Sequence, residues 1–451
     1  MIVLEEKIPE GFKETEIGVI PEDWDVNTLD SITGGKRPIS YGIVQTGPHI
    51  QDGIPCLRVL DIVNGSINTD NLIRTTQKIS SAYKRTQLKE NDLVIPLRGK
   101  VGEVGIIGKE LVGANLTRGV ALIALEGEFI PQFIKQALCS EGSQNRLLNS
   151  MNGSALQEIS IGTLRSFKIS SPKHPEEQTA IANALSDVDA LLTELEKLIA
   201  KKQAIKTATM QQLLTGKTRL PQFATFAEGK KQGQPKGTKP SELGEIPEDW
   251  DVLLMDEVTD SLSSGATPFR GNPSFFKGNN KWITSGELKY AVINDTIEKI
   301  SDEAIKKANL KVHPSGTFLM AITGLEAAGT RGSCGIVGTP ATTNQSCMAI
   351  YPNKKLKSYF LFHWYVYNGE ELALKYCQGT KQLSYTAGLL KTLPILVPSD
   401  TNEQTAIATI LSDMDSEIQT LEQRLSKTRQ IKQGMMQELL TGRTRLPLKN
   451  D

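Results

Sequence analysis

Residues 177–221 read EQTAIANALSDVDALLTELEKLIAKKQAIKTATMQQLLTGKTRLP, and nearly the same sequence returns at residues 403–447. The second copy, EQTAIATILSDMDSEIQTLEQRLSKTRQIKQGMMQELLTGRTRLP, begins 226 residues later, from Glu177 to Glu403. The same spacing separates EIGVIPEDWDV, from Glu16, and ELGEIPEDWDV, from Glu242. Solenoid repeats have periods of roughly 20–50 residues. The chain therefore contains one domain-sized unit written twice.

Each copy has the apolar spacing of a long, paired helix. Two sets of apolar residues interleave in it, and each set recurs every seven positions, which is the coiled-coil pattern. At ~1.5 Å per residue, about 40 residues give a rod of ~60 Å. We predict two helices that pack antiparallel on each other. Their pairing residues are Ile181, Leu185, Val188, Leu192, Leu195 and Ile199 in the first copy, and Ile407, Leu411, Met414, Ile418, Leu421 and Leu425 in the second.

The remaining sequence predicts two α+β domains. Short apolar runs separated by glycine and asparagine indicate strands between residues 28 and 170, and FIPQFIKQALCSEGSQNRLLNSM, from Phe129, indicates a helix. The second domain repeats the edges of the first but not its middle. The predicted fold class is α+β, with two similar domains, two long antiparallel coiled-coil helices and a pseudo-twofold internal repeat. The predicted boundaries are a lead-in at 1–15, domains at 16–172 and 241–398, helices at 173–216 and 399–442, a linker at 217–240 and a tail at 443–451.

Charge and cysteine content restrict the class of protein only loosely. Lys and Arg total 51, as do Asp and Glu, so any argument for nucleic-acid binding rests on local charge. The five cysteines form no C-x-x-C pair, which fits a reducing, cytoplasmic setting. The N-terminal sequence is not that of a signal peptide, and no apolar run approaches ~18 residues. We therefore expect a cytoplasmic protein without a membrane span.

Catalytic motifs are missing from the sequence. The four histidines have no metal-site spacing, and no nucleophile–histidine set can be assembled from local signatures. NPSF at 272–275 is similar to the NPPY/F signature of amino-methyltransferases, but Ser274 replaces the second proline and no glycine-rich cofactor loop precedes it. A duplicated chain without such motifs indicates recognition rather than catalysis.

Polar and basic residues on the predicted loops are candidates for contact with DNA. Lysine and arginine neutralise phosphates, arginine reads guanine, and asparagine or glutamine reads adenine. The first domain offers Arg58, Lys84, Arg85, Arg98, Lys100, Asn115, Arg118 and Ser154. The second offers Lys281, Trp282, Arg331, Asn344, Gln345, Thr380 and Lys381.

The order of these motifs resembles a known family. A domain opened by PEDW, then EQTAIA and LLTG-x-TRLP, and then all of it again, looks like the specificity (S) subunit of a type I restriction–modification system. The resemblance implies two target-recognition domains, each reading one half of a bipartite, asymmetric site in double-stranded DNA, and helices that set the spacer length. It also implies two methyltransferase (M) subunits that bind S-adenosylmethionine and methylate adenine N6, and restriction (R) subunits that use ATP and Mg. This chain would bind no cofactor or metal and would not be an enzyme.

Two other functions remain open on the sequence alone. A structural coiled-coil adaptor would make no sequence-specific contact with DNA. A fused DNA methyltransferase would need a cofactor loop and an NPPY-like site, and the sequence shows neither.

Overall fold

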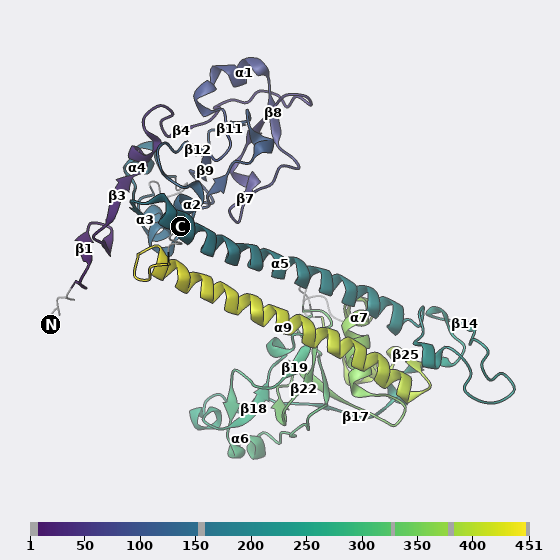
Figure 1. Ribbon diagram of the computed structural model, residues 1–451. Coiled ribbons are helices and arrows are strands. Elements are labelled where there is room, and N and C mark those ends of the chain that lie inside the picture. The colour runs from purple at the N-terminus through teal and green to yellow at the C-terminus, as the bar shows by residue number, and fades with distance from the viewer. Residues whose placement is uncertain (1–7, 152–157, 326–329, 378–382, 448–451) are drawn as a thin grey trace. The chain divides into compact units, whose positions relative to one another are not determined.

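The computed structural model describes residues 8–151, 158–325, 330–377 and 383–447 (Figure 1). The chain divides into two compact units. Unit 1 combines residues 1–196 with 423–451, and unit 2 is residues 197–422. The prediction had treated the helices as segments apart from the domains. Each unit instead combines one α+β domain with part of both long helices.

The two long helices are α5 (Pro175–Leu214, 40 residues) and α9 (Thr401–Leu439, 39 residues). Proline suits the first position of α5 because its missing N–H has no partner there in any helix. Gly216 and Gly442 follow the two helix ends with φ of +68° and +70°. This left-handed conformation is the usual C-terminal stop and favours glycine.

Within each unit the two helices run antiparallel, as predicted. In unit 1, Lys432 pairs with Asp189 at 2.6 Å and Arg429 pairs with Glu196 at 2.6 Å, so the contact moves forward along α5 and backward along α9. The same direction holds in unit 2. There Lys202 pairs with Glu417 at 2.7 Å and Lys206 pairs with Asp415.

The heptad residues are buried to different degrees. Ile181 and Leu185 lie in the core of unit 1 together with Leu439 and Leu440 from the end of α9. Ile407 and Leu411 occupy the corresponding place in the core of unit 2. The first part of each helix therefore packs into a domain. Of the other predicted pairing residues, Leu195, Ile199 and Ile418 are buried, and Val188, Leu192, Met414, Leu421 and Leu425 are partly exposed.

The domain of unit 1 contains a four-stranded sheet of order β10-β9-β12-β4 and a three-stranded sheet of order β11-β5-β8. Three further pairs are β1-β2, β6-β7 and β13-β3. The strands are β1 (Phe12–Thr15), β2 (Gly18–Pro21), β3 (Trp24–Thr28), β4 (Ser40–Tyr41), β5 (Ile54–Leu57), β6 (Ile62–Val63), β7 (Ser66–Ile67), β8 (Ile73–Thr75), β9 (Leu93–Pro96), β10 (Gly105–Ile106), β11 (Asn115–Leu116), β12 (Val120–Ile123) and β13 (Lys168–Pro172). The helices are α1 (Gln77–Ala82), α2 (Pro131–Cys139), α3 (Glu141–Asn149) and α4 (Ile161–Ser166).

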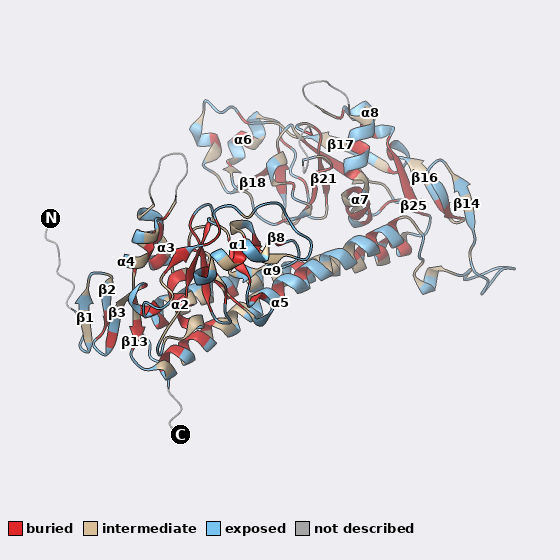
Figure 2. Ribbon diagram, turned by 90° about the horizontal axis from the view of Figure 1, so that it is seen from above, coloured by how far each residue is buried: buried red, intermediate tan, exposed pale blue. Residues whose placement is uncertain are grey.

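The domain of unit 2 has a five-stranded sheet of order β17-β24-β21-β22-β19 and a three-stranded sheet of order β20-β18-β23. Helix α7 packs on β21 and β22 (Figure 1), and the central strand β21 is buried (red in Figure 2). The strands are β14 (Thr238–Ser241), β15 (Gly244–Pro247), β16 (Trp250–Leu254), β17 (Thr259–Ser264), β18 (Asn280–Ile283), β19 (Ala291–Ile293), β20 (Lys299–Ile300), β21 (Phe318–Ala321), β22 (Cys334–Val337), β23 (Ala341–Thr343), β24 (Cys347–Pro352) and β25 (Pro394–Pro398). The helices are α6 (Asp302–Lys307), α7 (Ser358–Tyr376) and α8 (Ala387–Lys391).

This architecture confirms the predicted α+β class, while several local predictions need correction. The single helix expected from Phe129 is two helices, because Ser140 is extended and its hydroxyl accepts the N–H of Ser143 as the N-cap of α3. Strands β1 and β14 lie in the segments predicted as lead-in and linker. The predicted Asn64–Gly65 turn joins β6 to β7, with positive φ at both residues.

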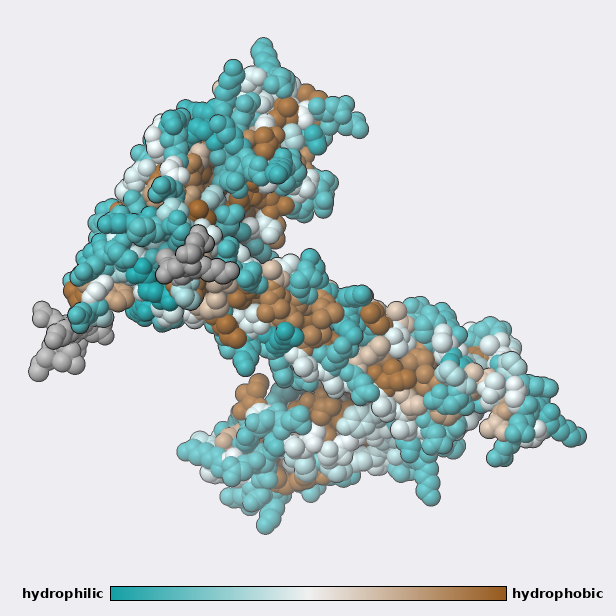
Figure 3. Space-filling view, in the orientation of Figure 1, coloured by the Kyte–Doolittle hydropathy of each residue, from teal (hydrophilic) through white to brown (hydrophobic). Residues whose placement is uncertain are grey.

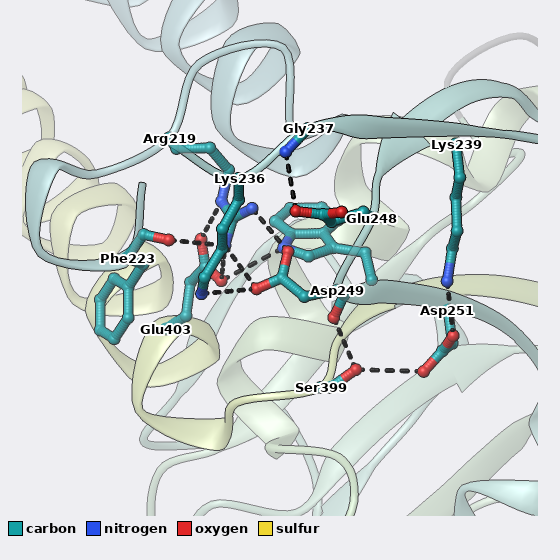
Figure 4. A network of polar contacts seen from close by, with 11 residues as sticks. Arg219, Phe223, Lys236, Gly237, Lys239, Glu248, Asp249, Asp251, Ser399 and Glu403 are labelled. Atoms are coloured by element: carbon teal, nitrogen blue, oxygen red, sulfur yellow. Dashed lines mark hydrogen bonds and ion pairs between the residues drawn. The ribbon is translucent and has the colours of Figure 1, made fainter. Parts of the chain in front are cut away.

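The repeated motifs meet at one buried junction in unit 2 (Figure 4). Arg219 donates to both oxygens of Glu403, at 2.7 Å each, and to Asp249 at 2.7 Å. Trp250 Nε1 donates to Glu403 at 3.2 Å, and Lys236 donates to Asp249 at 2.7 Å. We predicted that Glu403 closes a capping box at the start of α9. That prediction is wrong, because its carboxylate is held by the arginine and the tryptophan.

Unit 1 contains the same junction, built from residues 226 positions away. Arg445 donates to Asp23 at 2.9 Å and to Glu177 at 2.7 Å. Among the described residues, the Nε1 of Trp24 has no hydrogen-bond partner, unlike that of Trp250. In both junctions the arginine belongs to one repeat copy and its carboxylates belong to the other. Each domain is therefore closed by the helix end of the opposite copy.

Two buried histidines make unit 2 sensitive to acid. Burial, and secondarily Lys206, lowers the pKa of His363 to about 3, although Asp415 Oδ2 lies 3.9 Å from its Nδ1. Burial, and secondarily Lys311, lowers the pKa of His313 to about 4. In the unfolded chain both would titrate near about 6.5. Below that pH the unfolded state binds more protons than the folded state, so stability falls.

We therefore expect the free energy of unfolding of unit 2 to decrease steadily as the pH is lowered from about 6.5 towards 4. Urea unfolding at pH 7.5 and pH 5.5, followed by hydrogen exchange in each unit, would measure the loss. Replacing the exposed His174 of unit 1 by asparagine is the control and should leave the pH dependence unchanged. An equally steep decrease in unit 1 would contradict the assignment to His313 and His363.

Candidate nucleic-acid interface

Two exposed arginines lie on neighbouring loops at one end of the main sheet of unit 1. Arg118 is in the turn between β11 and β12, and Arg98 follows β9. The residue before Arg98 donates its N–H to the carbonyl of Gly119 at 2.9 Å, which fixes the two loops together. Within the part of the chain that the structure describes, neither guanidinium group has a hydrogen-bond or ion-pair partner. Both are available to an anionic or base-edge ligand.

The other predicted residues of unit 1 differ in availability. Lys84 and Arg85 are exposed in a short 3-10 helix, η3 (Lys84–Thr86). Lys100 donates to the carbonyl of Ile62 at 2.9 Å and is half-buried. Arg58 is held by Asp61 through two hydrogen bonds of 3.1 and 2.8 Å, so it is committed to an internal ion pair.

Two predicted residues cannot contact DNA in this structure. Asn115 is fully buried, and its side chain accepts from Ser80 at 2.6 Å. Trp282 is 1% exposed, and its Nε1 donates to the carbonyl of Ala266 at 3.1 Å. Asparagine and tryptophan were chosen by residue type alone, but here both satisfy the interior of the domain.

The predicted residues of unit 2 form a less basic surface. Gln345 is exposed, Asn344 is half-buried, and Arg331 lies 3.9 Å from Glu370. Lys281 donates to Thr339 at 2.7 Å. Ser154, Thr380 and Lys381, which were also predicted, lie outside the described residues.

The structure adds residues that the sequence did not single out. Arg270 pairs with both oxygens of Glu298 and stacks 4.2 Å above the ring of Phe276. The neighbouring Phe269 is 72% exposed. Thr267, which follows β17, donates to Gln345 at 2.6 Å. A basic residue inside an aromatic-rich segment, PFRGNPSFF, was the available signal for the first of these.

The described surface shows no alternative centre of chemistry. No group of three or more His, Cys, Asp or Glu residues that could hold a metal ion occurs among the described residues. None of the helices in the described part of the chain is long and apolar enough to cross a membrane. The face of unit 1 seen in Figure 3 is mostly hydrophilic, with scattered hydrophobic patches. These features favour a polar recognition surface.

The class of protein follows from comparison with known families. A family described as the type I restriction modification DNA specificity domain matches this chain twice, at residues 21–207 and 247–430. The two matches cover more than half of the chain and one falls on each repeat. The chain belongs to this family.

Individual relatives agree with this assignment. The EcoBI specificity subunit of Escherichia coli is 32% identical over 182 residues, which are 40% of this chain and 38% of that protein's length. The MjaVIII specificity subunit of Methanocaldococcus jannaschii is 24% identical over 99% of both chains. The crystal structure of a type I restriction–modification S subunit from M. genitalium covers 96% of this chain and 98% of its own, with a TM-score of 0.59 and 15% identity. This structural likeness concerns the fold.

Proposed function

We propose that this chain is the DNA sequence-recognition subunit of a type I restriction–modification complex. Each domain reads one half of a bipartite, asymmetric target in double-stranded DNA. One observation carries the proposal: two domains share the same frame and the same junction, yet their exposed loops bear different side chains. A constant frame with variable loops is what two different half-sites require.

The partners follow from the same proposal. Two methyltransferase subunits dock on this chain, bind S-adenosylmethionine and methylate adenine N6, while restriction subunits that use ATP and Mg cleave unmodified DNA. The chain itself contributes no catalysis and binds none of these cofactors. The long helices set the number of bases between the half-sites. Their uninterrupted lengths of 40 and 39 residues support a rigid spacer.

A domain exchange tests the recognition function. Residues 28–170 would be replaced by the same segment of another family member, and methylated adenines would be mapped genome-wide with the M subunit present. We expect one half of the methylated site to change and the other half to stay the same. An unchanged site would favour the structural adaptor.

A binding measurement tests the enzyme alternative. Isothermal titration of the purified chain with S-adenosylmethionine is expected to show no saturable binding. Tight binding would favour a fused methyltransferase and would overturn the proposal that catalysis belongs to the partners.

A further inference from the structure

We infer that one turn in each unit reads a base directly, with Arg118 selecting guanine in unit 1 and Gln345 selecting adenine in unit 2. The inference rests on the proposed DNA-recognition function. It adds the side chains that read and the class of base that each one takes.

The turn in unit 1 is defined by its backbone hydrogen bonds. The N–H of Val120 donates to the carbonyl of Thr117 at 3.1 Å, which closes the turn around Arg118. The N–H of Thr117 donates to Leu57 at 2.9 Å and fixes the turn to β5. Arg118 therefore projects from a rigid position, and its own N–H is bound to the carbonyl of Ile43 at 2.9 Å.

The turn in unit 2 repeats this pattern. The N–H of Cys347 donates to the carbonyl of Asn344 at 3.2 Å, which closes the turn around Gln345. The N–H of Asn344 donates to Ile283 at 2.9 Å and fixes the turn to β18. Gln345 thus occupies the position that Arg118 occupies in unit 1.

A second loop confirms that the two turns correspond. The residue before Arg98 donates its N–H to Gly119 at 2.9 Å, and the residue before Thr323 donates to Ser346 at 2.9 Å. Arg98 is bridged to Glu158, and Thr323 is bridged to residue 384 in the same antiparallel manner. The loop beside the turn therefore carries a cation in unit 1 and a neutral hydroxyl in unit 2.

The side chains at the two positions differ in what they offer a base. Arg118 is exposed and has no partner among the described residues, so its guanidinium can present two parallel N–H donors. Gln345 is exposed, and its Oε1 accepts from Thr267 at 2.6 Å, which orients the amide. At the position of Thr267, unit 1 has the apolar Val44, 47% exposed, which leaves Arg118 unconstrained.

These donors and acceptors match different bases. Guanine presents two acceptors, O6 and N7, in the major groove, and arginine donates to both. Adenine presents one acceptor and one donor, N7 and N6, and glutamine can complement both. The half-site read by unit 1 should therefore contain a guanine at this position, and the half-site read by unit 2 should contain an adenine.

The test is a pair of substitutions in the full chain, expressed together with its M subunit, with all methylated adenines mapped. Arg118→Gln should reduce the preference for guanine at one position roughly tenfold or more, leaving every other position unchanged. Gln345→Arg should do the same for one adenine in the other half-site. Arg118→Lys keeps the charge but loses the paired donors, so it should relax the same guanine position. Arg85→Gln, on the exposed 3-10 helix, is the matched control and should leave the motif intact.

The outcomes separate the inference from the proposed function. Failure of the wild-type complex to methylate any defined sequence would overturn the proposed function itself. A wild-type motif that persists in both Arg118→Gln and Arg118→Lys would overturn the base-reading role of Arg118. Uniformly weaker methylation with an unchanged motif in a folded variant would assign Arg118 to a phosphate and would also overturn it.

Discussion

Replacing Arg219 by alanine is expected to lower the free energy of unfolding of unit 2 by about 3–5 kcal/mol, the range for breaking a buried ion pair. The side chain of Glu403 is 1% exposed and that of Arg219 is 11% exposed, so the substitution leaves a carboxylate buried without its cation. Asp249 would keep only Lys236. At present Arg219 and Lys236 together overcome burial and hold the pKa of Asp249 below its usual value.

Denaturant unfolding of wild type and Arg219→Ala measures this loss, and Lys217→Ala is the matched control. Lys217 lies two residues away in the same segment and is exposed, so its replacement should change stability by about 0.5 kcal/mol or less. Equal stabilities for the two variants would show that the junction does not hold α5 to the second domain. The arginine of unit 1, Arg445, is 43% exposed, so we expect Arg445→Ala to be the milder substitution.

The second large effect concerns the heptad residues. Leu411→Ala is expected to cost about 2–5 kcal/mol, because Leu411 is fully buried in the core of unit 2 and its truncation leaves a cavity. The residue two heptads further along α9, Leu425, belongs to the same predicted set but is only partly buried.

Thermal and denaturant unfolding would compare Leu411→Ala with Leu425→Ala. We expect the loss for Leu425→Ala to be less than half as large, because water already reaches that side chain. Similar losses would mean that the helix pair, and not the packing of each helix on a domain, determines the stability of this part of the chain.

The helices were predictable from sequence because their signal is local and repeated. A seven-residue apolar period extends over more than twenty residues, and glycine marks each end. The α+β class was accessible for a similar reason, since short apolar runs between turn residues are typical of strands. The function class came from the motif order rather than from any single residue.

The candidate interface was much less predictable. Charge and residue type alone cannot show that Asn115 serves Ser80 or that Arg58 serves Asp61, since those partners are brought together by tertiary structure. The fixed spacing of 226 pairs Arg118 with Asn344, whereas the backbone hydrogen bonds pair it with Gln345. One extra residue between the strands of unit 2 causes this shift, and sequence alone does not reveal it.

The junctions were also hidden, although every residue in them belongs to a conspicuous repeat. PEDW, EQTAIA and TG-x-TRLP are far apart in each copy, and sequence does not state which copy each motif contacts. The structure shows that Arg219 crosses to the second copy and that Arg445 crosses to the first. Recurrence indicated that these residues mattered for the fold, but not how they meet.

This exchange of helix ends has a consequence for biosynthesis. Unit 2 is contiguous, so its polypeptide is complete once residue 422 has been translated. Unit 1 is discontinuous, and the arginine that closes its junction is residue 445. On the ribosome the domain that is made first therefore has to wait for nearly the last residues before it can close, and a prematurely terminated chain would contain a finished second unit beside an unfinished first one.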